Sequence, residues 1–494
     1  MKHALILTVF ATAATAEPVF TDKSANLPPH IYGGDWEHFV GGGVAVFDCN
    51  GDALPDLFAA GGATPAALFV NGGDFQFSPA PLPELIATTG AYPLDIDSDG
   101  LMDLFVLRAG ANVALRGLGG CQFADATTDW GLPVQADTWS TAFSAWWEDD
   151  SRPVMAVGNY VDRSNPGGPF MVCDENAILR PETTGYSTEP LTPGFCPLSM
   201  LAARDARGRM TLRLSNDRQY YVRPGWEQMW DITDRRFLTE GDGWKKLSIW
   251  GMGIASRDLT GDGLDEVMLT SMGDNVLSYA NADGSYSPAR FDLGTYAAIP
   301  FDGSDGRPST GWHAQFGDVD NDGLDDLFIA KGNVDQMPTN AIHDPNNLLM
   351  QQPDGTFVER ADVAGVATTE RSRGAALVDL DLDGRLDLVV MNRRAPMELY
   401  RNETPDTGHW LGVSLSQSGG NRNAIGASVQ VETAQGVHIQ QATVGGGHAG
   451  GQAGPLHFGL GQATAATVTV TWPDGTATVQ DVPMDQYVTI TRAP

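Results

Sequence analysis

The sequence predicts an all-β protein: a seven-bladed β-propeller followed by a small C-terminal domain of β-sandwich type. A short acidic motif between two apolar segments recurs along most of the chain, at intervals of roughly 50 to 60 residues, which suits one propeller blade each. Glycine (58 residues) and proline (30 residues) are frequent, which favours turns and short strands. Near residue 402 the motif stops, and short alternating segments separated by glycine-rich turns follow it.

The N-terminus has the features of a signal peptide over residues 1–16. Lys2 is followed by an apolar run at 4–10, and Ala14-Thr15-Ala16 forms a small-residue cleavage site before Glu17. The apolar run is too short to span a bilayer, and no later stretch reaches the length of a membrane span. We therefore expect a secreted or periplasmic protein without direct membrane insertion.

The charge and the cysteines agree with an exported chain. The sequence has 62 acidic and 30 basic residues, a formal net charge of -32, which excludes nucleic acid as a partner because phosphates need a basic face. Four cysteines fit an oxidising compartment. We expect the pair Cys173–Cys196, which brackets one loop-rich segment, and the pair Cys49–Cys121, which lies in neighbouring repeats.

The acidic motif is D-x-[DN]-x-D-G-x-x-[DE], with copies that start near residues 48, 95, 147, 203, 258, 318 and 379. Glycine-bearing hairpin signals follow the copies, so each unit is expected to contain four antiparallel strands. The last unit lacks a fourth strand, and residues 18–27 resemble the fourth-strand segments of other units. We therefore expect an N-terminal strand to close the last blade, with the propeller at 17–402 and the second domain at 408–494.

Five of the copies have the side chains of a Ca²⁺ site. Positions 1, 3 and 5 supply oxygen ligands, glycine at position 6 allows the sharp turn, and the acid at position 9 closes the cage. In a single copy, an acidic surface turn without metal is an equal alternative. Several copies with one spacing favour the metal, because clustered carboxylates repel one another without a cation. The predicted ligands are Asp48, Asn50, Asp52, Asp56, Asp95, Asp97, Asp99, Asp103, Asp258, Thr260, Asp262, Glu266, Asp318, Asp320, Asp322, Asp326, Asp379, Asp381, Asp383 and Asp387.

The remaining copies are degenerate. The copy near 147 has Trp147 and Ser151 at ligand positions, and the copy near 203 has Arg207 where a carboxylate is expected. We expect the third and fourth blades to keep the fold and to have lost the ion. The first copy has Ala53 in place of glycine, which predicts a weaker site.

The loops resemble the FG-GAP/VCBS repeats of integrin α-chain propellers and of exported bacterial proteins. The C-terminal segment resembles the ASPIC/UnbV domain at 421–427 (NRNAIGA), 445–452 (GGGHAGGQ), 456–461 (LHFGLG) and 472–475 (WPDG). Both features in this order resemble the cartilage acidic protein family. The resemblance implies a secreted, calcium-binding protein with adhesion or interaction roles, and it implies no particular catalytic activity.

Three functions follow as hypotheses. The first is a binding, adhesion or scaffolding module, with Ca²⁺ holding the blades and an unidentified protein or glycan as ligand. The second is a calcium-dependent polysaccharide hydrolase or lyase with its site at the propeller axis, although the sequence contains no G-x-S-x-G, H-E-x-x-H or Walker motif. The third is an accessory protein of an exported complex. The oligomeric state is left open.

Two segments outside the acidic loops are candidates for function. His448 and His457 could form a metal or catalytic pair, or His448 could simply belong to a tight glycine-rich loop. Residues 158–195 read as a long insertion between strands, and long ordered loops are often functional. This segment is therefore the expected recognition loop.

Overall fold

The computed structural model describes residues 17–149, 151–167, 172–217, 225–296, 300, 306–335 and 337–493. The predicted signal peptide lies outside these residues. The described part consists of β-strands and turns with a few single-turn helices, so the all-β prediction is confirmed. The helical turns are η1 (Ser24–Asn26), η2 (Trp36–His38), η4 (Glu240–Asp242), η5 (Phe291–Leu293) and α1 (Ala361–Ala364).

In the described part of the chain, the propeller consists of seven sheets built from consecutive antiparallel strands, which we number as blades 1 to 7 in chain order. Blade 1 contains β2 (Val44–Phe47), β3 (Asp56–Ala59), β4 (Ala67–Asn71) and β5 (Phe77–Ala80), and blade 2 contains β6 (Thr88–Leu94), β7 (Asp103–Arg108), β8 (Val113–Gly117) and β9 (Phe123–Asp125). Blade 3 contains β10 (Ser140–Trp146), β11 (Val154–Asn159), β12 (Asn176–Pro181) and β13 (Tyr186–Leu191). Blade 4 contains β14 (Pro197–Arg204), β15 (Met210–Asn216), β16 (Gln228–Asp231) and β17 (Arg236–Phe237).

Blades 5 to 7 continue the same order along the chain. Blade 5 contains β18 (Gly251–Arg257), β19 (Glu266–Ser271), β20 (Val276–Ala280) and β21 (Tyr286–Pro288), and blade 6 contains β22 (Gly311–Gly317), β23 (Asp326–Lys331), β24 (Asn347–Gln351) and β25 (Phe357–Glu359). Blade 7 contains β26 (Ser372–Val378), β27 (Asp387–Asn392) and β28 (Glu398–Asn402), and β1 (Phe20–Asp22) is its fourth strand.

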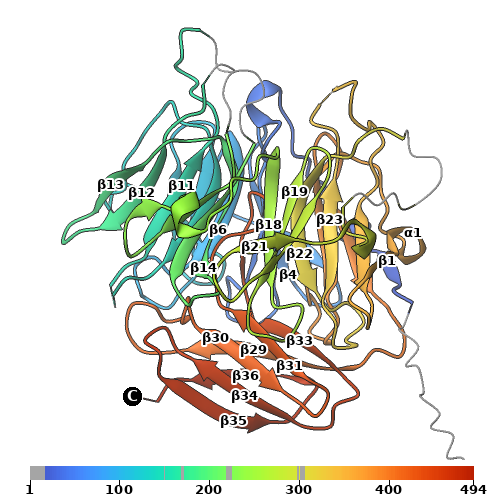
Figure 1. Cartoon of the computed structure of the whole chain (residues 1–494). Coiled ribbons are helices and arrows are strands. Elements are labelled where there is room, and N and C mark those ends of the chain that lie inside the picture. The colour runs from blue at the N-terminus through green and yellow to red at the C-terminus, as the bar shows by residue number, and fades with distance from the viewer. Residues whose placement is uncertain are drawn as a thin grey trace, which may run out of the picture.

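The sheets form a closed ring, which Figure 1 shows from its side. The first strand of each blade packs beside the first strand of the next, from β2 through β6, β10, β14, β18 and β22 to β26, and β26 returns to β2. In blade 7 the N-terminal strand pairs with β28, with Phe20 opposite Asn402. This is the pairing expected from the likeness of residues 18–27 to fourth-strand segments. It ties the two ends of the ring together and covers an open strand edge.

The core lies between adjacent blades. One apolar cluster, for example, joins Val44 and Val46 of blade 1 to Val389 and Leu399 of blade 7. The inner strands are therefore covered on both faces by neighbouring sheets. This explains why strands such as β7 are nearly continuous apolar runs instead of alternating ones.

The C-terminal domain is a pair of sheets packed face to face, seen in red below the propeller in Figure 1. A single core cluster joins Leu411 and Phe458 of one sheet to Val429 and Val468 of the other. The predicted small β domain is confirmed. Its strands are β29 (His409–Ser416), β30 (Ser428–Glu432), β31 (Val437–Gln441), β33 (Leu456–Gly461), β34 (Ala466–Thr471), β35 (Ala477–Val482) and β36 (Gln486–Thr491), while β32 (Gln452–Ala453) joins blade 1 beside β2.

Both predicted disulfides are present. Cys49–Cys121 links blades 1 and 2 across 72 residues of chain, and Cys173–Cys196 links a loop of blade 3 to the start of blade 4 across 23 residues. Within the described residues, no helix has the length and apolarity needed to cross a membrane.

The extent of the predicted recognition loop was wrong. Residues 176–191 form β12 and β13, the outer two strands of blade 3, with Gly185 in the left-handed conformation at the turn between them. The insertion between strands is therefore confined to residues 160–175, of which 168–171 lie outside the described residues. β13 lies at the outer edge of the blade and exposes most of its side chains, so it lacks the apolar pattern of the inner strands.

Candidate metal centres

The five acidic loops adopt one backbone geometry. In each loop the position-1 carboxylate accepts a hydrogen bond from the amide of position 6, over 2.6–3.0 Å. Position 6 always has positive φ, between 72° and 95°, which glycine adopts without strain. The position-6 residues are Ala53, Gly100, Gly263, Gly323 and Gly384. Because each loop joins the first strand of a blade to the second, the five turns lie at the same end of the propeller.

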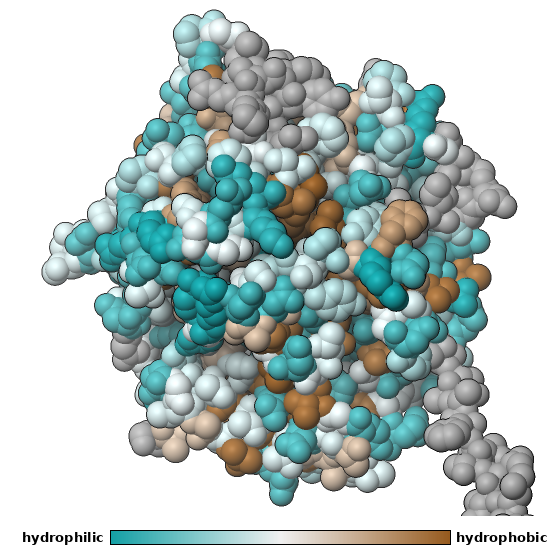
Figure 2. All heavy atoms as spheres, viewed as in Figure 1, coloured by the Kyte–Doolittle hydropathy of each residue, from teal (hydrophilic) through white to brown (hydrophobic). Residues whose placement is uncertain are grey.

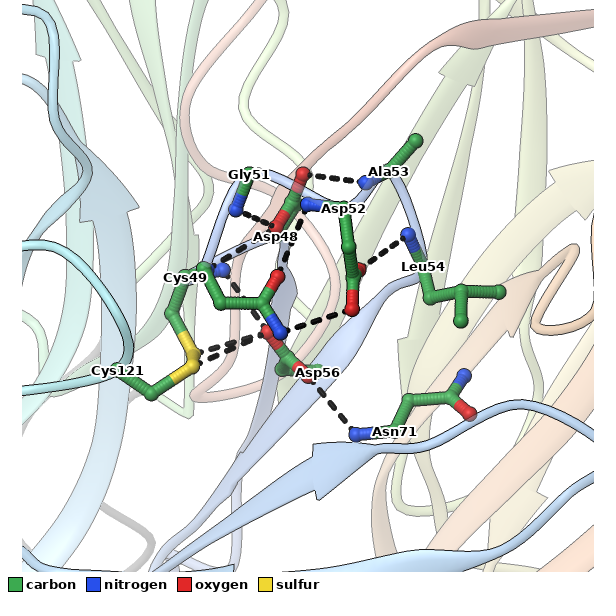
Figure 3. The surroundings of a disulfide bond; sticks show 10 residues. Asp48, Cys49, Gly51, Asp52, Ala53, Leu54, Asp56, Asn71 and Cys121 are labelled. Carbon is green, nitrogen blue, oxygen red and sulfur yellow. Dashed lines mark hydrogen bonds between the residues drawn. A yellow bond between two sulfur atoms is a disulfide. The ribbon is translucent and has the colours of Figure 1, made fainter.

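The position-9 carboxylate connects the loop to the sheet. Figure 3 shows this in blade 1, where Asp56 accepts hydrogen bonds from the amides of Cys49 (2.9 Å) and Asn71 (2.8 Å). Asn71 is the last residue of the third strand. Asp103, Asp326 and Asp387 make the same two bonds in blades 2, 6 and 7. This role was not predicted, and it is compatible with metal binding because each carboxylate oxygen has a second lone pair.

Three loops bring three carboxylates within 4.8 Å of one another. The groups are Asp95, Asp97 and Asp99 in blade 2, Asp318, Asp320 and Asp326 in blade 6, and Asp379, Asp381 and Asp387 in blade 7. Among the described residues, the loops of blades 1 and 5 form no such group of their own carboxylates. In blade 1 the Asn50 side chain instead donates to Asp52 (2.8 Å), and in blade 5 Thr260 offers only a hydroxyl.

The disulfide beside the blade-1 loop is not a ligand. Asp56 Oδ2 lies 2.9 Å from Cys49 Sγ and 3.5 Å from Cys121 Sγ (Figure 3). Since both sulfurs are oxidised, they offer neither a thiolate to a metal nor a proton to the carboxylate. The bond instead fixes the second position of this loop against blade 2.

Electrostatics favour a cation in these loops. Burial, reinforced by neighbouring carboxylates, raises the pKa of Asp103 to about 7 and the pKa of Asp322 to about 7. The same causes raise the pKa of Asp326 well above its ordinary value. Several buried carboxylate oxygens accept no hydrogen bond within the described structure: Asp95 Oδ1, Asp97 Oδ1 and Asp381 Oδ1. Hard oxygen donors that are buried and repel one another fit Ca²⁺.

The degenerate loop of blade 4 supplies its own positive charge. Arg209 Nη2 lies 2.6 Å from Asp205 Oδ2, at the short turn between β14 and β15. A guanidinium thus lies beside the remaining carboxylate. Arginines also contact two of the acidic loops, where Arg116 lies 2.8 Å from Asp97 in blade 2 and Arg401 lies 2.6 Å from Asp381 in blade 7, but those loops hold more carboxylates than guanidinium groups. In blade 3 the corresponding loop includes Asp150, which lies outside the described residues.

The C-terminal domain packs against the end of the propeller that carries the loops. Tyr487 donates to Asp379 Oδ2 in blade 7, and the ring of His457 hydrogen-bonds Asn321 Oδ1 of blade 6 at 2.8 Å. In blade 2, Arg422 donates to the carbonyl of Ser98 (3.0 Å). The predicted ligands therefore lie at an interface between two domains, which the sequence did not reveal.

A glycine-rich loop of the C-terminal domain, residues 443–452, enters the propeller axis. Its backbone bonds to the innermost strands of blades 1 to 5, at Val46, Ala91, Ala145, Met200 and Ile254, over 2.7–3.3 Å. In Figure 1 this part of the chain rises from the red domain into the ring. We call residues 443–452 the axial loop.

Close backbone approach explains the glycines of the axial loop. A Cβ on Gly450 would lie 2.0 Å from the carbonyl oxygen of Val44. On the propeller side, a Cβ on Gly43 or Gly90 would lie 1.8 Å or 1.7 Å from the carbonyl oxygen of Ala449. The glycine run is therefore a packing requirement, and not a phosphate cradle.

The two candidate histidines do not meet. His448 is completely buried at the axis, where its amide donates to His313 Nδ1 (3.1 Å) and its ring packs on Trp312. Burial lowers the pKa of His448 and of His457 to about 3, so both are neutral. The axial loop occupies the axis, where the alternative hypothesis placed the site of a polysaccharide hydrolase or lyase. A cavity of about 410 Å³ lies beside the axial loop, between the propeller and the C-terminal domain.

Comparisons with known proteins match both parts of the chain. An FG-GAP-like repeat matches residues 48–106, 258–329 and 318–390, and a region described as ASPIC and UnbV matches residues 417–494. The repeat matches leave out residues 107–257, which contain the two degenerate loops.

Curated relatives match over a short stretch. Cartilage acidic protein 1 of Mus musculus is 33% identical over 109 residues, which is 21% of this chain and 17% of that protein. The Homo sapiens protein is also 33% identical over 109 residues, covering 21% of this chain and 16% of that protein. The match thus spans less than a fifth of these relatives.

Among solved structures, BBS1N in complex with ARL6DN aligns with a TM-score of 0.48 at 12% identity, over 80% of this chain and 99% of that one. YCF48 from Cyanidioschyzon merolae aligns with a TM-score of 0.42 at 9% identity, over 78% and 99%. Scores this low add nothing to the strand pairing that defines the fold. The two family matches show what the chain contains: FG-GAP-like repeats are followed by a region described as ASPIC and UnbV, the order that also underlies its resemblance to the cartilage acidic protein family.

Proposed function

We propose that this protein is an exported, calcium-binding β-propeller that acts as a binding, adhesion or scaffolding module for a protein or glycan partner. One observation carries the proposal: five loops share one backbone geometry, and three of them gather three carboxylates within 4.8 Å. The residues that would hold Ca²⁺ are the twenty predicted ligands. The ion would supply positive charge that makes the buried acids compatible with the fold.

The axial loop favours binding over catalysis. It fills the place where the alternative, a calcium-dependent hydrolase or lyase of polysaccharides, would need its substrate. The end of the propeller away from the C-terminal domain remains for a partner. There, in Figure 1, lie the blue η2 segment and the loop after β11.

The partner-facing end that we propose is built on a largely buried aromatic cluster, in which Trp139 and Tyr160 are 0% and 7% exposed. Trp36 and Phe39 of the η2 segment pack on Trp139, and Phe39 and Trp139 also pack on Tyr160 of the blade-3 loop. Figure 2 shows hydrophobic residues in small patches among hydrophilic ones on one side of the molecule. A mixed surface of this kind suits a partner bound through both apolar contacts and hydrogen bonds.

Metal analysis of the purified mature chain tests the cation. We expect about four to five calcium ions per chain, from the number of loops with suitable oxygens. Removing them with EGTA should lower the melting temperature, since saturation at 100 times Kd stabilises a protein by about 2.7 kcal/mol per site. The double variant Asp318→Asn with Asp320→Asn should lose one ion, whereas Asp205→Asn in blade 4 should lose none. A metal-free chain that melts at the same temperature with and without EGTA would refute the proposal.

Partner binding and export need separate measurements. Glycan arrays and pull-downs from the native compartment, each with calcium and with EGTA, should show calcium-dependent capture. Turnover of a glycan on a polysaccharide panel would instead favour the enzyme. N-terminal sequencing of the exported chain should begin at Glu17, and limited proteolysis should cut between the proposed domains 17–402 and 408–494.

A further inference from the structure

The five metal loops share a motif but differ in exposure. Position 5 of the motif is exposed to solvent in blades 1, 2 and 5, at Asp52, Asp99 and Asp262. The same position is half-buried in blades 6 and 7, at Asp322 and Asp383. Since the loops have one backbone geometry, the difference arises from what lies over them. This is the C-terminal domain in both blades, and in blade 7 Arg385 and Arg401 also cover Asp383.

The C-terminal domain covers the blade-6 loop with backbone. The amides of Gly408 and Gly461 donate to the carbonyls of Asp320 (3.0 Å) and Asn321 (2.9 Å). Gly459 lies so close that a Cβ there would be 1.9 Å from Asp318 Oδ2. Asp318, Asp320 and Asp326 are accordingly only 4%, 2% and 1% exposed.

The same domain covers the blade-7 loop with two aromatic side chains. The Tyr487 hydroxyl donates to Asp379 Oδ2 over 2.5 Å, and a Cβ on Gly384 would lie 1.9 Å from the Trp410 indole. Trp410 and Tyr487 also pack on each other, with ring centroids 4.9 Å apart. Asn321 of blade 6 donates to the carbonyl of Gly384 (2.9 Å), so the two covered loops form one unit.

The contact at blade 2 is peripheral by comparison. Arg422 reaches the carbonyl of Ser98, and its guanidinium stays 3.9 Å from Asp95 with about half of the side chain exposed. Asp99 remains open to solvent on the other side. An ion in this loop would keep a path to water that an ion under Trp410 and Tyr487 would lack.

We propose that the C-terminal domain is a lid on the metal loops of blades 6 and 7, so that the chain holds two kinds of cation site. Two enclosed ions exchange slowly, because the lid must open first, and the ions of blades 1, 2 and 5 exchange freely. This inference rests on the proposed function, in which these loops bind Ca²⁺. It assigns Trp410 and Tyr487 a role in retaining the ion, which the acidic motif alone does not give them.

Stopped-flow mixing of the calcium-loaded chain with an excess of a chromogenic calcium chelator tests the lid. We expect two phases, with about two ions in the slow phase and release at least about tenfold slower than in the fast phase, as ~1.4 kcal/mol of opening free energy would give. Trp410→Ala should speed the slow phase at least about tenfold and leave the fast phase unchanged. Tyr487→Phe should speed it by a smaller factor, since it removes only one hydrogen bond.

Tyr186→Phe is the matched control, because the Tyr186 hydroxyl is buried and makes no hydrogen bond within the described structure. It should leave both phases unchanged, and circular dichroism should show that all three variants are folded. Release of four to five ions in one fast phase would overturn the lid and leave calcium binding intact. Two phases that neither Trp410→Ala nor Tyr487→Phe alters would also overturn it. Absence of any bound ion would overturn both proposals.

Discussion

At the scale of single residues, the acidic loops show how one position can decide local strain. Position 6 is glycine in four loops, but Ala53 occupies it in blade 1 with φ near 72°. A Cβ makes that conformation unfavourable by about 1–2 kcal/mol. The sequence marked this position as a departure, and the structure shows that the loop keeps its turn and retains the strain.

Replacing Ala53 with glycine should therefore stabilise the protein. We expect Ala53→Gly to raise the free energy of unfolding, because it removes about 1 kcal/mol of backbone strain from the folded chain. The net gain is smaller than this, because glycine also gives the unfolded chain more conformational entropy. Thermal unfolding in excess calcium measures the change. Ala63→Gly, at a turn residue outside the left-handed region, should give no stabilisation. Equal effects of the two changes would contradict the strain argument.

A buried acid away from the metal loops gives a pH dependence. Burial raises the pKa of Glu227 to about 8, against 4.5 for an ordinary glutamate, although the amide of Asn216 donates to it. The folded chain thus holds this proton more tightly than the unfolded chain. Its contribution to stability is complete below pH 4.5 and is lost as the pH rises through about 8.

Glu227→Gln removes that titration. The difference in melting temperature, variant minus wild type, should increase between pH 5 and about pH 8 and level off above it, because in that range only the wild type loses a proton on unfolding. Melting curves in excess calcium at each pH measure it. A difference that stays constant over this range would show that Glu227 does not titrate in the folded chain within it.

At the scale of elements, the axial loop is the feature that local pattern did not explain. The glycine-rich sequence was compatible both with a tight turn and with the surroundings of a functional histidine. In the structure they permit backbone contact with five blades, while His448 packs against blade 6. The requirement comes from segments far apart in sequence, such as Gly90 and Ala449, and periodicity within either segment cannot show it.

The axial loop makes a matched pair of glycine substitutions possible. Gly450→Ala places a Cβ 2.0 Å from the Val44 carbonyl oxygen, and should destabilise the protein by about 1–3 kcal/mol or more through overpacking. Gly454→Ala, four residues further along, meets nothing within 4 Å and should be tolerated. Chemical denaturation measures both. Equal stability of the two variants would show that the axial loop is not held tightly.

At the scale of the whole molecule, ring closure joins residues nearly 400 positions apart. Strand β1 pairs with β28, and the Val19 amide and the Lys23 amide bond to Thr404 and Leu399. These contacts cover the last free edge of the ring. They also make the stability of blade 7, with its acidic loop, depend on the N-terminus.

Deleting residues 17–27 should therefore loosen the whole ring. We expect a fall in melting temperature and faster proteolysis near β28, since an unpaired edge strand exposes its amides and carbonyls. Native-state hydrogen exchange should locate the added exchange in β26, β27 and β28. Unchanged protection in these strands would mean that blade 7 is stable with three strands.

The sequence by itself determined the repeating architecture, the acidic loops and the cysteine pairs. Each of these depends on residues close together in sequence or on a spacing that repeats, as in Asp318, Asp320 and Asp322. Only the tertiary structure decided that the axial loop fills the ring and that Trp410 and Tyr487 cover two loops. Those contacts join the surfaces of two domains. The two surfaces become complementary only when both domains have folded, so no local pattern of hydrophobicity or charge in the sequence predicts the contacts.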